Sequence, residues 1–160
     1  MIANVVLDCR GLDRGIPILL TWLQRDGVIA PESVPRVLDA MGDQSVSVEE
    51  AVVGLTGVNE LDIAERYARF FHVPLAGEEK TPDTGSALAA LLPERFCREH
   101  LMVPIARTRT GMAVAMVDPS RNWLHAQMTM MTGLDVDISV APLSRVALWI
   151  ERLFPGAPAA

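Results

Sequence analysis

The sequence predicts an α+β fold: a helical N-terminal lobe of about four short helices, followed by a C-terminal ββαβα lobe whose small sheet is covered by helices on one face. Apolar residues recur at helical spacing from Ile16 to Phe71, which indicates amphipathic helices. After residue 100, two β-rich runs flank a glycine-containing turn, which predicts a hairpin. The 160 residues are 50% hydrophobic and 21% charged, so the composition is that of a folded chain.

The charge and the cysteine content exclude several classes of protein. A net charge of −6 opposes binding to nucleic acid or to an anionic membrane surface. Two cysteines are too few for a disulfide framework, no apolar run approaches the ~18 residues of a membrane-spanning helix, and the N-terminus lacks the basic region of a signal peptide. We therefore expect a cytoplasmic protein.

Short-range signals place the four helices of the helical lobe, which is expected in residues 1–76. The signals are, in chain order, Gly27 after the first helix, Pro31 before the second, a capping box of Ser47 and Glu50 before the third, Asn59 before the fourth and Pro74 after it. Residues 22–28 and 52–58 each place Gly-Val four residues after an apolar pair. This similarity predicts two degenerate helix-turn-helix repeats.

A change of pattern divides the chain near residue 80. Residues 77–86 are rich in turn formers and charge and are predicted to be a connector to a small α/β lobe at 87–155, with a tail at 156–160. The expected elements are helices at 88–92 and 94–100, strands at 102–107 and 112–117, a helix from Asp118-Pro119 to Gly133, a strand at 136–140 and a helix from Pro142 to Leu153. Pro104 places the first strand at an edge of the sheet, because proline has no N–H.

The second half carries a family resemblance. Five short motifs occur in order between Leu91 and Pro142; they are Leu92-Pro93, His100 to Ile105, Val114 to Pro119, Thr132-Gly133 and Val136 to Val140. This order resembles the N-terminal domain of type II secretion and type IV pilus assembly ATPases (GspE N-terminal, MshEN-like). With the glycine repeat of the first half included, the resemblance covers roughly Ile16 to Phe154.

The resemblance implies a non-catalytic protein-interaction module. In this family the domain docks the motor onto an inner-membrane platform protein, so a protein of a secretion or pilus machine is the expected partner. The chain would then be recruited to the inner membrane only through that partner. The ATPase domain of the family is absent from this sequence, since no Walker A stretch occurs.

The resemblance also implies an alternative, a cyclic di-GMP sensor. The residues that match the apolar and glycine positions of the family's ligand-binding repeats are Leu19, Leu23, Gly27, Ile29, Val34, Leu38 and Gly57. Ile18 replaces the starting arginine of the first repeat, Met41 replaces its closing glutamine, and Glu49 lies in the second repeat. Because a dianionic ligand requires charged donors, these replacements disfavour cyclic di-GMP, and we expect no other cofactor.

Other residues suggest chemistry less specifically, and no catalytic or metal-binding residue is assigned. Cys97 and His100 are three residues apart on a predicted helix and could form a nucleophile with its base, but a buried thiol beside a helix-end histidine is the favoured interpretation. Asp135 and Asp137 could form an acid–base pair, or an exposed polar edge, which is favoured. His72 and His125 are interpreted as structural.

Two groups of side chains are candidates for partner contacts. Arg107 and Arg109 at the hairpin tip, with Arg121 and Arg145, could receive an acidic segment or could be ordinary solvated surface. The methionines at 112, 116, 128, 130 and 131 could form an adaptable docking surface, although helical spacing favours the core for Met128 and Met131.

Overall fold

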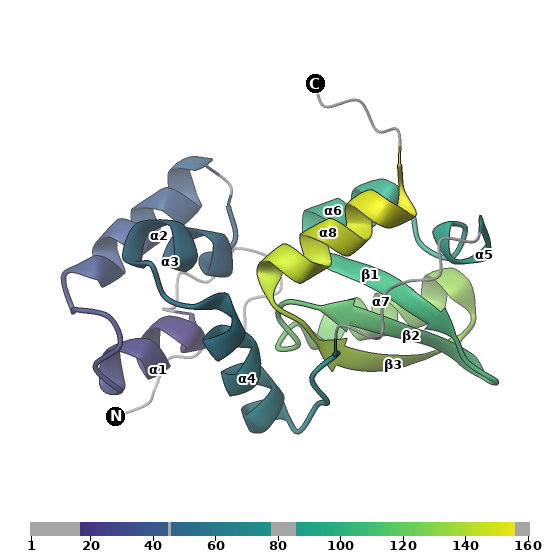
Figure 1. Ribbon diagram of the computed structural model, residues 1–160, viewed down its shortest axis with the longest axis horizontal. Coiled ribbons are helices and arrows are strands. Elements are labelled where there is room, and N and C mark those ends of the chain that lie inside the picture. The colour runs from purple at the N-terminus through teal and green to yellow at the C-terminus, as the bar shows by residue number, and fades with distance from the viewer. Residues whose placement is uncertain (1–16, 45, 78–85, 156–160) are drawn as a thin grey trace. The chain divides into compact units, whose positions relative to one another are not determined.

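The computed structural model describes residues 17–44, 46–77 and 86–155 (Figure 1). The chain forms two compact units, Met1–Ile63 and Ala64–Ala160. The described elements are α1 (Ile18–Arg25), α2 (Ser33–Gln44), α3 (Val48–Thr56), α4 (Glu60–Phe71), α5 (Ser86–Ala89), α6 (Glu94–His100), β1 (Met102–Arg107), β2 (Gly111–Met116), α7 (Asn122–Thr132), β3 (Asp135–Val140) and α8 (Leu143–Leu153). This is the predicted α+β fold, with helices first and the sheet in the second half. Within the described residues, no helix is long and apolar enough to cross a membrane.

Local capping explains where most helices begin and end. The Ser47 hydroxyl accepts a hydrogen bond from the Glu50 N–H (3.1 Å), and the Glu50 carboxylate accepts one from the Ser47 N–H (3.0 Å), so the predicted capping box is confirmed. Asn59 accepts a hydrogen bond from the Leu61 N–H at the start of α4. Gly27 and Gly57 follow α1 and α3 with φ of 72° and 71°, a left-handed conformation that glycine adopts without strain.

Two helix starts differ from the prediction. The chain at Pro31 forms a turn, in which the Ser33 N–H donates to the Ala30 carbonyl, and α2 begins only at Ser33. Asp118 accepts a hydrogen bond from the Ser120 N–H, so its carboxylate closes a turn before α7, which begins at Asn122. Proline and aspartate are favoured in turns as well as at helix starts, which explains both shifts. The helix expected at 88–92 is also displaced, to Ser86–Ala89.

The sheet has the order β1-β2-β3. β1 pairs with β2 as the predicted antiparallel hairpin, and β3 pairs with β2 in parallel. Pro104 is in edge strand β1, as predicted, and the register shifts between Pro104 and Ala106. Gly111 opens β2 against Asp135, and a Cβ atom built on Gly111 would lie 1.8 Å from the Asp135 carbonyl oxygen. Only glycine fits this contact, so Gly111 sets how closely β2 and β3 approach at this end.

The core of the second unit lies on both faces of the sheet. Neighbouring residues of a strand point to opposite faces, and both Val114 and Ala115 of β2 are fully buried. α7 packs on β3, whereas α5, α6 and α8 pack on β1 (Figure 1). The expectation of cover on one face is therefore wrong, because the predicted helix of the β2-α7-β3 crossover packs on β3 while α5, α6 and α8 pack on β1.

The predicted connector at 77–86 lies mostly outside the described residues, as does the tail at 156–160. The segment just before it is described. α4 ends at Phe71, and His72 adopts a left-handed conformation with φ of 54°. Leu75 then forms an isolated parallel bridge with Val140 at the end of β3.

Candidate interaction surfaces

The residues expected to contact cyclic di-GMP lie in the first unit. Leu19, Leu23, Ile29 and Val34 are buried among its apolar residues, Leu38 is half-buried, and Gly27 and Gly57 occupy the left-handed turns after α1 and α3. Each apolar side chain in this set, Leu38 apart, is thus used to pack the helices. Their role toward a ligand stays a prediction.

The charged residues of the same unit bear on that prediction. Glu49, in the first turn of α3, is only 1% exposed, and the Glu50 carboxylate is held in the capping box. The Glu50 carboxylate is therefore fixed at the start of α3. It would repel the phosphates of a dinucleotide that approached this helix end.

Cys97 is a structural thiol. It is fully buried in the core of the second unit, and this burial raises its pKa to about 12, with smaller effects from Arg98 and Glu94. Because only the thiolate is a nucleophile, a thiol with this pKa is inert near neutral pH. This supports the interpretation of Cys97 as a buried apolar residue.

His100 packs between two aromatic rings. Its ring centroid lies 4.8 Å from that of Phe96 and 5.4 Å from that of Trp123, both edge to face. Desolvation lowers the pKa of His100 from its ordinary value, the nearby Glu99 opposes this shift, and Arg121 adds to it. The imidazole is therefore neutral at physiological pH and fills space beside α7.

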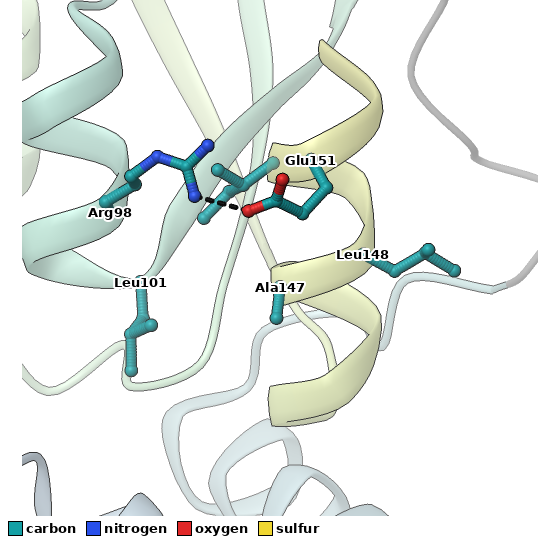
Figure 2. Close-up of a pocket in the computed structure, with 6 residues that line it drawn as sticks. Arg98, Leu101, Ala147, Leu148 and Glu151 are labelled. Atoms are coloured by element: carbon teal, nitrogen blue, oxygen red, sulfur yellow. Dashed lines mark hydrogen bonds and ion pairs between the residues drawn. The ribbon is translucent and has the colours of Figure 1, made fainter. Parts of the chain in front are cut away.

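A groove lies between α6 and α8 and has a volume of about 290 Å³. Leu101, Ala147, Leu148 and Ile150 give it an apolar lining, and an ion pair between Arg98 Nη1 and Glu151 Oε1 (2.5 Å) crosses it. Figure 2 shows Ala147 and Glu151 on the side of α8 that faces α6, and Leu148 pointing away along the outer side of the helix. Leu148 is 48% exposed, so apolar surface continues from the groove over α8.

Arg98 anchors one wall of this groove. Its Nε donates to Glu94 Oε2 (2.9 Å), and hydrogen bonds to Glu151 and Glu94 raise the pKa of the guanidinium further above its ordinary value. Its remaining terminal nitrogen, Nη2, is buried and has no hydrogen-bond partner in the described part of the chain. A buried donor without a hydrogen-bond acceptor is rare in protein structures.

A second pocket, of about 440 Å³, lies beside β3. His72 and His125, which are 53 residues apart in the sequence, both line it, together with Asp137. His125 Nε2 hydrogen-bonds to the Val136 carbonyl oxygen (3.0 Å). No group of three histidine, cysteine, aspartate or glutamate side chains among the described residues is placed to hold a metal ion. No sequence pattern predicted this pocket, because its lining combines the turn at His72 with the distant residues of β3.

The predicted basic and methionine clusters do not form single surfaces. Arg121 Nε lies 3.8 Å from Asp118, Arg145 donates to the Ala76 carbonyl (2.9 Å), and Arg107 and Arg109 are exposed at the hairpin. The methionines divide between core and surface. Met112, Met116 and Met128 are buried, whereas Met131 is 44% exposed and Met130 is 86% exposed near the end of α7. The expectation of a core position is therefore confirmed for Met128 and wrong for Met131.

These features define a small α+β module with surface grooves. Residues 58–160, well over half of the chain, match the MshEN domain model, and the chain belongs to the MshEN domain family. The family resemblance found in the sequence is thereby confirmed.

Known relatives agree with this assignment. The chain is 24% identical over 132 residues to the type IV pilus assembly ATPase PilB of Myxococcus xanthus (strain DK1622), a match that covers 82% of this chain and 23% of PilB. The chain thus spans about a quarter of the length of that relative. Two solved structures share the fold, each over 84% of this chain: the N-terminal domain of XpsE (92% of that chain, 21% identity, TM-score 0.63) and MshE with cdg, cyclic di-GMP (97% of that chain, 18% identity, TM-score 0.59).

Proposed function

We propose that this chain is a non-catalytic interaction module of a type II secretion or type IV pilus system, and that it docks a motor or inner-membrane platform protein. The similarity to PilB and to the N-terminal domain of XpsE supports this class of partner. The observation that carries the proposal is the apolar groove between α6 and α8, with Leu148 exposed beside it. Exposed apolar surface of this kind is typical of partner contacts.

The chemistry of the groove favours a helix as the element that docks. An amphipathic helix places apolar side chains every three or four residues along one face. Such a face could contact both Ala147 in the groove and Leu148 on the outer side of α8 (Figure 2). Docking of such a helix would bury the apolar lining of the groove and the exposed side chain of Leu148 beside it.

A titration with two matched variants tests this proposal. The chain is titrated with the purified cytoplasmic region of the platform protein, and separately with the motor domain, of a secretion or pilus machine from the same organism. Leu148→Lys should weaken binding by about 30-fold, which corresponds to about 2 kcal/mol, because a charged side chain replaces an apolar contact that docking buries. Met130→Lys makes the same change of charge on α7, outside the groove, and should leave the affinity unchanged. Equal effects of the two variants, or no binding of either protein, would refute docking at this groove.

A second candidate is the sensing of cyclic di-GMP, which the structure of MshE with cdg favours. The paired glycine turns at Gly27 and Gly57 suit two ligand-binding repeats, whereas the buried apolar side chains and the fixed Glu50 carboxylate of α3 weigh against a dianion. At about a hundredfold excess over its Kd, a ligand stabilises the folded chain by about 2.7 kcal/mol, which raises Tm by several degrees. A thermal shift with cyclic di-GMP, compared with GMP, therefore decides whether this candidate is kept.

A further inference from the structure

The outer edge of β3 is covered only near its C-terminal end. Here the Val140 N–H donates to the Pro74 carbonyl (2.9 Å), and the Ala76 N–H donates to the Val140 carbonyl (2.7 Å). β3 has no neighbouring strand on this side within the described residues. The chain's own segment 74–76 therefore shows that this edge accepts an extended backbone running parallel to β3.

The backbone groups of Ile138 are left open on the same edge. In a parallel ladder the N–H and C=O of a residue point to one side, and this side alternates along the strand. Because both groups of Val140 point outward, those of Ile138 and Val136 do so too. His125 Nε2 covers the Val136 carbonyl, but no hydrogen bond to the outward groups of Ile138 occurs among the described residues. Pro74, the next residue of the bridging segment, has no N–H to donate.

The pocket of about 440 Å³ lies beside these open groups. His72, Val73 and Pro74 form one wall, and Val136, Asp137 and Ile138 form the other. His72 has a left-handed φ of 54°, and the first backbone hydrogen bond of this segment to β3 among the described residues is at Pro74, whose carbonyl accepts from the Val140 N–H. The space between the two walls has an apolar lining and can hold part of an added strand.

The negative charges at this edge determine which kind of strand could pair with β3. Asp135 and Asp137 are two residues apart on β3, so their carboxylates lie on one face, and both are exposed. Neither has an ion-pair partner in the described ranges. Pairing with β3 of a second copy would bring four carboxylates together on chains of net charge −6, which opposes self-association. A strand with basic side chains would instead be attracted.

We propose that the edge of β3 from Asp135 to Ile138 docks a short extended peptide of a partner protein, which adds a strand beside Ile138 and carries lysine or arginine opposite Asp137. Side chains alternate along the peptide, so the residue next to the basic one is apolar and lies against Ile138 and Pro74. A second basic residue, two positions from the first, meets Asp135. This edge shares no residue with the groove between α6 and α8, so the two proposals can fail independently.

The test uses the ¹⁵N-labelled 160-residue chain and synthetic peptides. The probe is a capped six-residue peptide of alternating lysine and valine; the controls replace lysine with glutamate, or the central valine with proline. The lysine peptide should shift the amide signals of residues 136–139 in a saturable way. The glutamate peptide should bind at least about tenfold more weakly, since two exposed ion pairs become repulsive, and the proline peptide should lose the shift of Ile138.

A reversal of charge on the chain completes the test. Asp137→Lys should weaken binding of the lysine peptide by about tenfold and improve binding of the glutamate peptide, whereas Asp39→Lys, which makes the same change on α2, should do neither. Equal binding of both peptides to the original chain, or shifts that avoid β3, would overturn the proposal. Broadening of the Ile138 signal that grows with chain concentration in the absence of peptide would assign the edge to a second copy and would also overturn it.

Discussion

Single residues in this protein are fixed by contacts that can each be tested by one substitution. Gly111 is the clearest, because a Cβ atom at this position would overlap the Asp135 carbonyl at 1.8 Å. The pKa shifts of Cys97 and His100 are caused mainly by burial, which opposes the charged form of each side chain. The three effects are local and independent of any partner.

Gly111→Ala is expected to destabilise the chain by about 2–4 kcal/mol, since β2 and β3 must separate at their start. Urea unfolding measures the free energy. Gly42→Ala is the matched control: Gly42 lies within α2 with no atom near the added Cβ, so the better helix former should stabilise by about 0.5–1 kcal/mol. Effects of the same sign would show that the contact at Gly111 does not govern stability.

The thiol of Cys97 should resist alkylation in the folded chain. In a Cys9→Ser background, which leaves one cysteine, iodoacetamide at pH 8 should modify almost no native protein and should modify the chain readily in urea, because a pKa of about 12 leaves almost no thiolate. Rapid modification of the native chain would revive the nucleophile interpretation.

The pH dependence of stability follows from His100. Its folded-state pKa is lower than the ordinary 6.5, so below pH 6.5 the unfolded chain binds a proton that the folded chain does not. Stability is therefore full above pH 6.5 and falls as the pH decreases from there toward the folded-state pKa. His100→Gln should remove this part of the decrease, while His125→Gln should retain it; unfolding curves measured from pH 7.5 to 5 distinguish the two variants.

At the scale of elements, the sequence predicted features that depend on neighbouring residues, but it did not predict contacts between distant segments. The capping box of Ser47 and Glu50, the Asn59 cap and the edge position of Pro104 depend on neighbours in the chain, and each was predicted correctly. The predicted starts of α2 and α7 were displaced because Pro31 and Asp118 serve turns equally well.

The candidate sites divide in the same way. The pocket beside β3 is lined by His72 and Pro74 together with Asp137, which is far from them in the sequence. Hydrophobic periodicity predicts local secondary structure but not contacts between such distant residues. Likewise, helical spacing predicted a core position for both Met128 and Met131, but only Met128 is buried, whereas Met131 is 44% exposed.

The capping box provides the test at this scale. Ser47→Ala removes the acceptor for the Glu50 N–H and should destabilise the chain by about 1 kcal/mol. Ser47→Asp keeps an acceptor at the start of α3 and should restore most of the loss. If both variants were as stable as the original chain by urea unfolding, the first turn of α3 would be held by packing alone.

At the scale of the whole molecule, the thiol that could have acted as a nucleophile is buried, whereas apolar side chains are exposed at the surface. Cys97 lies in the core, while Leu148 is exposed on α8 and Leu75 is exposed beside the edge of β3. Such a chain offers surfaces for binding and, among the described residues, no activated nucleophile. The exposed apolar surface supports the docking proposal, and the raised pKa of Cys97 weighs against a role for this thiol as a nucleophile.

Hydrogen–deuterium exchange of the full chain tests the central claim most directly. It compares the chain alone, with the platform protein or motor domain, and with cyclic di-GMP. We predict that the protein partner slows exchange in α6 and α8, which border the groove, and that Leu148→Lys abolishes this protection while Met130→Lys preserves it. Protection of α1 and α2 by the dinucleotide, together with no protection of α6 and α8 by either protein, would contradict docking and identify the chain as a ligand sensor.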